Sequence, residues 1–180
     1  TKVYDGKPLA NDEVTVSGDG WATGEGATYT VTGSQTLPGG SPNSFEYTLD
    51  AGTKADNYNI TKEVGQLTVT ARPDEAKFEI TVVANSGTEK YDGTEKGVSG
   101  LVQTEFEFDG VKYAVEGLSA EAKGTDAGEY TANVTGTAVV RDADNNDVTS
   151  QFVVKTQAGK LTIEKRQVKL TSATDTKVYD

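Results

Sequence analysis

The sequence predicts an all-β protein: two tandem antiparallel β-sandwich modules, followed by the first strand of a third. Short segments alternate apolar and polar residues with the period of two that a half-buried strand requires. Valine, threonine and tyrosine, which favour strands, are spread along the chain, and the 20 glycines favour turns. Similar segments also recur at a fixed spacing, which indicates tandem modules.

The repeat is clearest around a Tyr-Asp-Gly element. Residues 1–5 are identical to residues 176–180, and a near copy occupies residues 88–93. The tyrosines, at positions 4, 91 and 179, are 87 and 88 residues apart. Residues 65–73 also resemble residues 159–167. We therefore expect a superrepeat of 175 residues, made of two unlike modules of about 87 residues each.

Each predicted module is a series of short strands separated by turns. In the first module the alternating segments are residues 13–17, 27–32, 45–49 and 66–70. In the second module they are residues 77–83, 129–134, 150–155 and 160–164. Between two further alternating arms, Asp109-Gly110 predicts a hairpin with a two-residue type I′ turn.

Proline and the phase of the repeat set the expected module boundaries. Pro73 cannot donate to a sheet ladder, so one strand should end there and the next begin after it. We expect a first module at residues 1–73, a second at 74–165, and the start of a third at 166–180. Residues 167–173 resemble residues 77–83, and each segment precedes a Tyr-Asp element. The first module is thus expected to lack the strand that should precede its own tyrosine.

Composition excludes several classes of function. The chain has no cysteine or histidine, so thiolate nucleophiles, imidazole bases and zinc sites built from these residues cannot form. A net charge of −11 opposes binding to nucleic acid, which needs clustered Lys and Arg. No apolar run approaches the ~20 residues that span a membrane. We therefore expect no enzymatic activity, no nucleic-acid partner and no membrane insertion by this segment.

Several longer segments are distinctive: KVYDGKPL, EVTVSGDGW, GEGATYTVTGSQT, KYAVEGLSAEAKGTDAGEY and DADNNDVTSQF. They resemble the YDG- and MBG-type tandem repeats of bacterial cell-surface adhesin proteins, mainly from Gram-positive organisms. The resemblance implies extracellular immunoglobulin-like β-sandwich modules, strung between a cell-wall anchor and a distal adhesive region, with no catalytic motif. YDGTEKGVSG in the second module departs from this pattern, because it lacks the proline and leucine of YDGKPL. We expect its first hairpin to differ.

On this resemblance we expect a structural repeat segment of an extracellular stalk or filament on the bacterial surface, which spaces or projects an adhesive region. Its partners would be adjacent repeats of the same chain or filament. Two alternatives remain open. One is an adhesin repeat that itself binds host glycans or proteins. The other is a fibre subunit, in which residues 167–173 complete the first module of the next subunit by strand donation.

One acidic loop is a candidate calcium site. Residues 142–148, DADNNDV, hold five oxygen-bearing side chains, of which those of Asp142, Asp144, Asn146 and Asp147 are the candidate ligands. Oxygen ligands at alternating positions suit Ca²⁺, and apart from this possible site we expect no cofactor. The EF-hand pattern fails, because no glycine stands at the sixth position and Val153 occupies the twelfth, where glutamate belongs. The alternative is a solvated hairpin turn.

The aromatic residues admit structural or binding roles. Trp21, the only tryptophan, lies in a glycine-rich segment near Tyr29, where a ring could stack on a sugar; the alternative is a cap on the core. The tyrosine of each Tyr-Asp-Gly element is expected to cover one end of the sandwich core, while Asp-Gly forms a turn. In TDAGEY, Tyr130 is expected to fix a corner of the chain.

Overall fold

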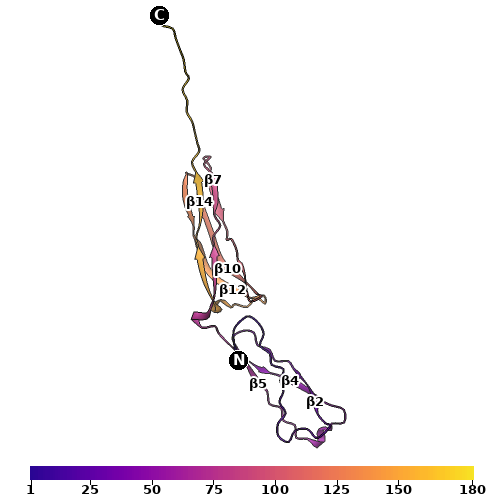
Figure 1. Cartoon of the computed structure of the whole chain (residues 1–180). Coiled ribbons are helices and arrows are strands. Elements are labelled where there is room, and N and C mark those ends of the chain that lie inside the picture. Colours follow the sequence, from indigo (N-terminus) through magenta and orange to yellow (C-terminus); the bar gives the residue numbers. More distant parts are fainter. The chain divides into compact units, whose positions relative to one another are not determined.

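A computed structural model describes residues 1–180 of the chain as an all-β protein (Figure 1). It contains 14 strands, and its only helices are three 3-10 turns of three residues each. These turns are η1 (Ala55–Asn57), η2 (Asp74–Ala76) and η3 (Thr149–Gln151). None of the helices is long or apolar enough to cross a lipid bilayer.

The chain divides into two compact units, each built from segments that are distant in sequence. Unit 1 comprises Thr1–Phe78, Glu107–Tyr113 and Val140–Val153. Unit 2 comprises Glu79–Phe106, Ala114–Val139 and Val154–Asp180. The first sequence repeat, residues 1–73, therefore lies entirely in unit 1, which also contains two short segments of the second repeat.

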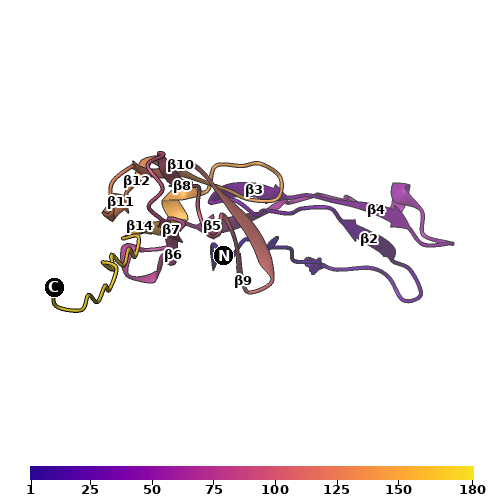
Figure 2. The same ribbon diagram turned by 90° about the horizontal axis from the view of Figure 1, so that it is seen from above.

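In unit 1 the first repeat forms a three-stranded sheet and a separate pair of strands. The sheet has the order β1-β5-β3, made of β1 (Lys2–Val3), β5 (Gly65–Thr70) and β3 (Gly39–Asn43). β1 runs parallel to β5, and β3 runs antiparallel to it. β2 (Ala27–Val31) and β4 (Phe45–Leu49) pair antiparallel, and Figure 2 shows them side by side.

In unit 2 the corresponding sheet has the order β11-β14-β7. It is made of β11 (Gly128–Ala132), β14 (Gly159–Glu164) and β7 (Gly87–Lys90), with β7 parallel and β11 antiparallel to β14. Leu161 and Ile163 alternate along β14 with less buried residues and point into the core. There they pack with buried alanines at positions 84, 120, 122 and 132.

The remaining strands also belong to the second repeat. β8 (Lys96–Ser99) pairs antiparallel with the last four residues of β10 (Val111–Gly124), and β12 (Val134–Arg141) pairs with the other edge of β10. β9 (Glu105–Phe108) also pairs with β10. β6 (Phe78–Val83) pairs with β13 (Phe152–Gln157).

Most of the predicted strands are confirmed, with their ends shifted by one or two residues. The type I′ hairpin is confirmed as well. Its φ angles are 51° at Asp109 and 83° at Gly110, the left-handed backbone that this turn needs at both positions.

Two predicted strands are wrong: residues 13–17 and 167–173 belong to no strand, although both alternate. Alternation prepares one face for burial, but a strand forms only where a neighbouring backbone supplies hydrogen bonds. In the second repeat, Leu101 and Val102 are the counterparts of residues 14 and 15, and they pair with the end of β6. Val102 N donates to the carbonyl oxygen of Val83 at 2.8 Å. In residues 1–73 no strand pairs with residues 13–17.

Tyr130 fixes a corner of unit 2, as its sequence context predicts. Its hydroxyl donates to the carbonyl oxygen of Asp126 at 3.0 Å. Its ring lies so close to Gly124 that a Cβ atom there would come within 2.2 Å of Cζ. The corner therefore needs both the tyrosine and a residue without a side chain beneath its ring.

We expect Tyr130→Phe to lower the free energy of unfolding by about 1 kcal/mol, because the ring stays while the hydrogen bond to Asp126 is lost. Urea unfolding followed by circular dichroism measures this change. Tyr179→Phe is the matched control, since Tyr179 is 99 % exposed and should leave stability unchanged. Equal stability of the two variants would contradict the corner role of Tyr130.

Candidate functional site

The Tyr-Asp-Gly element forms the same turn in both repeats. A carboxylate oxygen of Asp5 accepts a hydrogen bond from the amide of Lys7 at 2.9 Å, and Asp92 accepts one from Thr94 at 2.9 Å. The intervening glycines have φ of 77° and 84°. Aspartate therefore caps the backbone two residues ahead, and glycine supplies the left-handed conformation. Lys96 and Thr94 also hold the pKa of Asp92 well below its usual range.

The backbone of this tyrosine makes two hydrogen bonds at the end of its own repeat, one to the closing strand and one to an arginine side chain just beyond it. Its amide donates to the last residue of that strand, and its carbonyl accepts from the arginine two residues further on. In the first repeat these bonds are Tyr4 N to Thr70 O at 2.8 Å and Arg72 Nη1 to Tyr4 O at 2.8 Å. In the second they are Tyr91 N to Glu164 O at 3.0 Å and Arg166 Nη1 to Tyr91 O at 3.2 Å. We call this arrangement the tyrosine clamp.

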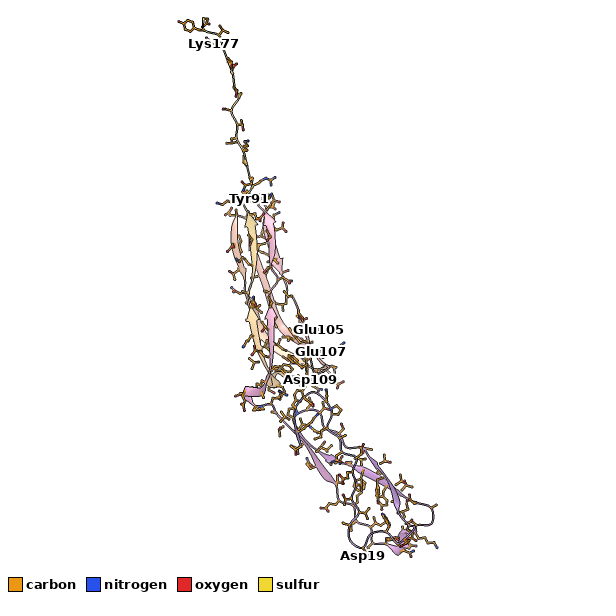
Figure 3. All side chains as sticks on the ribbon, viewed as in Figure 1. Asp19, Tyr91, Glu105, Glu107, Asp109 and Lys177 are labelled. Carbon is orange, nitrogen blue, oxygen red and sulfur yellow. The ribbon has the colours of Figure 1, made fainter.

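The exposed fraction of the tyrosine differs sharply among the three copies. Tyr4 is 0 % exposed, Tyr91 (Figure 3) is 37 % exposed, and Tyr179 is 99 % exposed. The Tyr4 hydroxyl lies 3.3 Å from the hydroxyl of Tyr113, and both groups are buried within unit 1. Burial raises the pKa of Tyr4 and of Tyr113, and their shared hydrogen bond raises that of Tyr4 further.

Arg72 links the clamp of the first repeat to residues of the second repeat in unit 1. Its amide donates to Oε1 of Gln151 at 2.8 Å, and its guanidinium carbon lies 3.9 Å from the ring centre of Phe78. Gln151 is the one polar residue that is buried, and this bond satisfies its oxygen. We call Tyr4, Arg72, Phe78, Tyr113 and Gln151 the junction cluster.

An open groove runs along the first repeat. It has a volume of about 1200 Å³, and its two walls are residues 13–22 and 57–65. β2 and β4 also contribute to its lining through Tyr29, Val31, Phe45 and Tyr47. The apolar lining residues of the two walls are Val14, Val16, Trp21, Ala22, Tyr58, Ile60 and Val64.

The two walls correspond to the two neighbours of β6 in the second repeat. The closing strands are offset by 94 residues, so residues 58–63 correspond to β13, the partner of β6. The tyrosines are offset by 87 residues, so residues 14 and 15 correspond to Leu101 and Val102. In the second repeat these neighbours bond to the end of β6: Ala84 N donates to Gln157 O at 2.9 Å, and Ala84 bridges Leu101. The groove therefore lies where a counterpart of β6 would lie.

The structure brings Trp21 and Tyr29 together. The indole N–H of Trp21 donates to the Tyr29 hydroxyl at 3.0 Å, and the Trp21 ring meets Tyr58 edge-on, with 4.9 Å between centroids. Tyr58 also donates to a carboxylate oxygen of Glu25 and accepts from the amide of Ala22. Tyr58 was not predicted as a site residue. The 94-residue offset, which pairs it with Phe152, is the signal that identifies it. Glycan contact by Trp21 and Tyr29 stays a prediction.

The carboxylates of the acidic loop, residues 142–148, accept hydrogen bonds mainly from backbone amides in and next to the loop. A carboxylate oxygen of Asp142 accepts from the amides of Asp144 and Asn146 at 3.0 and 2.8 Å. Asp147 accepts from the amide and hydroxyl of Thr149, which lowers its pKa. No three Asp or Glu side chains gather to hold a metal ion here or elsewhere in the chain. Asp142 and Asn146 are thus brought together, while Asp147 faces Thr149, and the calcium site stays a prediction.

Comparisons of the chain with protein-family models, with curated proteins and with solved structures found no match. The correspondence between the two repeats is therefore internal. It rests on the shared turn, the shared clamp and the shared register, in which Lys2 faces Val69 and Glu89 faces Ile163.

Replacing the glycine of the turn should cost much more in the first repeat than in the second. In Gly93→Ala the only cost is an alanine in left-handed backbone, because nothing lies within 4 Å of the new Cβ. We therefore expect the free energy of unfolding to fall by about 1 kcal/mol. At Gly6 the new Cβ would come 2.2 Å from the Tyr113 hydroxyl and 2.9 Å from Val111. We expect Gly6→Ala to lose at least ~2 kcal/mol, from strain plus overpacking. Urea unfolding compares the two variants, and equal losses would argue against close packing at Tyr4 and Tyr113.

The junction cluster should lose stability at alkaline pH. The pKa values of Tyr4 and Tyr113 are raised in the folded chain, so their contribution is complete below pH ~10, the unfolded value, and declines as the pH rises above it. Each tyrosine adds at most ~1.4 kcal/mol per pH unit to the fall in unfolding free energy. Tyr4→Phe should reduce this slope between pH 10 and 11.5, whereas Tyr179→Phe should not. An unchanged slope in Tyr4→Phe would contradict burial of the Tyr4 hydroxyl.

Proposed function

We propose that the chain is a structural repeat segment of an extracellular stalk or filament on a bacterial surface, which spaces or projects an adhesive region. Each repeat would be an immunoglobulin-like β-sandwich whose closing strand pairs in parallel with the strand just before its tyrosine. Neighbouring repeats would be its principal partners, so that length grows with the number of copies. The observation that carries this proposal is the tyrosine clamp, which is built twice with the same bonds.

The contrast between the two clamps supports an end-to-end arrangement. At Tyr4, residues of the second repeat complete the junction cluster and bury the ring within unit 1. At Tyr91 the two hydrogen bonds of the clamp are the same. The ring nevertheless remains partly exposed, and Arg166 contacts no aromatic ring. A further repeat following the second would bury Tyr91 as Tyr4 is buried. Repetition of one junction is how an array transmits order along its length.

The surface charge also suits a stalk. With a net charge of −11 in 180 residues, neighbouring stalks would repel one another side by side and stay soluble. Several ion pairs, such as Lys155–Glu79 and Lys160–Glu129, are exposed and contribute little to stability. The chain also lacks histidine and cysteine, the residues of the commonest nucleophile–base pairs. We therefore assign the fold a mechanical role.

Tandem copies of residues 1–175 test this proposal. We expect the maximum dimension of one, two and three copies, measured by small-angle X-ray scattering, to rise by a nearly constant increment per copy. The physical reason is that each repeat contacts only its neighbours. Collapse of the copies onto one another, with shrinking increments, would contradict a spacing role.

Tyr91→Ala provides the matched control for the junction. In a single copy, where the ring is partly exposed, we expect this change to cost less than ~1 kcal/mol of unfolding free energy. In two tandem copies the first Tyr91 should be buried, and the same change there should cost about 3 kcal/mol or more. Equal costs in the two settings would count against burial of Tyr91 by a following repeat.

A further inference from the structure

We propose that the groove of the first repeat binds residues 167–173 of a second copy of this chain as an added β-strand. This inference rests on the proposed function and deepens it, because it specifies how one copy joins the next. Four independent features carry it: the place of the groove in the fold, the register of the tail, the charge of both partners and the aromatic end of the groove.

The groove occupies the position of a strand that the second repeat possesses. Residues 13–17 of one wall and 58–64 of the other correspond to the two backbones that flank β6. These two segments lie outside any strand, so their alternating residues line the groove without a sheet partner. An added strand would supply the backbone hydrogen bonds that β6 supplies in the second repeat.

The tail carries the apolar pattern of β6 in the same register. Counted back from their tyrosines, which are 88 residues apart, Val168 and Leu170 correspond to Ile80 and Val82. Ile80 and Val82 are buried in the second repeat, whereas Val168 and Leu170 are 75 % and 90 % exposed. The tail therefore presents two side chains that are suited to a core that its own unit does not provide.

Charge favours the same pairing. Residues 165–173 include Lys165, Arg166 and Lys169 and no acidic residue. The groove lining includes Glu13, Asp19 and Glu63 against one lysine, Lys62. A basic strand thus meets an acidic groove, which steers association and makes it sensitive to salt.

The aromatic end of the groove fits the residue that would precede the strand. In unit 1, Phe78 at the start of β6 stacks on Phe108 and packs at a tilt against Phe152, with centroids 4.8 and 5.5 Å away. The counterparts of Phe108 and Phe152 in the first repeat are Trp21 and Tyr58, which touch edge to face. The same 88-residue offset places Arg166 at the position of Phe78. A guanidinium group binds well against such rings.

Trp21 makes this proposal directly testable, because the only tryptophan lies in the groove and the tail has no aromatic residue before Tyr179. The receptor is the full chain carrying Val168→Asp and Leu170→Asp, which disables its own tail. A peptide of residues 165–175 is titrated into it while Trp21 emission is recorded. We expect a saturable change in emission.

Two matched peptides separate apolar docking from charge. A peptide with Val168→Asp and Leu170→Asp should bind at least tenfold more weakly. A peptide with Lys169→Asp undergoes the same change in net charge, and it should bind within about threefold of the native peptide at ~0.5 M salt, where charge is screened. Val16→Asp in the receptor, at a partly exposed position of the groove wall, should weaken binding of the native peptide as well.

Sedimentation of the full chain tests whether the occupant is a second copy. The native chain should form oligomers as its concentration rises, and the Val168→Asp, Leu170→Asp chain should stay monomeric. Absence of peptide binding, equal binding of the native and doubly substituted peptides, or a native chain that remains monomeric would each overturn the proposal. If tandem copies still lengthen by even increments in that event, only the strand exchange falls. If the peptide binds tightly but the maximum dimension of tandem copies rises unevenly, the stalk proposal is overturned and the strand addition stands.

Discussion

The structure of both repeats depends on the tyrosine clamp, the two hydrogen bonds that hold the backbone of Tyr4 or Tyr91 to the end of its own repeat. They fasten the start of each repeat to its end, next to the parallel pairs β1–β5 and β7–β14. The arginine that donates the second of these bonds, Arg72 or Arg166, follows the closing strand by two residues, so closure of the repeat also positions a guanidinium group. In the first repeat that group then meets Phe78. Arg72 thus both closes the first repeat, at Tyr4, and contacts the start of the second, at Phe78.

Sequence alone predicts the parts of this arrangement that are local. The strands, the Asp109-Gly110 hairpin and the turn at Asp5-Gly6 follow from alternation and from glycine with positive φ. The corner at Tyr130 spans four residues and is likewise predictable. Residues 13–17 show the limit, because their alternation is present but the neighbouring strand that would pair with them is not.

The remaining features arise from contacts across long stretches of sequence. Tyr4 and Tyr113 are 109 residues apart, and nothing near either residue indicates that their hydroxyls meet. Gln151 is a polar residue in a polar segment, yet it is buried, and its Oε1 accepts a hydrogen bond from the amide of Arg72, 79 residues away. The groove could not be predicted from the sequence either, because no local pattern marks its position. Comparison with the second repeat explains it, because β6 lies at the corresponding position there.

The parallel pairing of β1 with β5 and of β7 with β14 affects how the chain would respond to tension. When two strands run in the same direction, a pull on the start of one and the end of the other slides them past each other along their axes. All the bonds of the pair then resist together, instead of opening one after another as in a hairpin pulled apart from its ends. β7 and β14 face each other over four residue pairs. A pull between the start of β7 and the end of β14 would therefore load all four pairs along the strand axes.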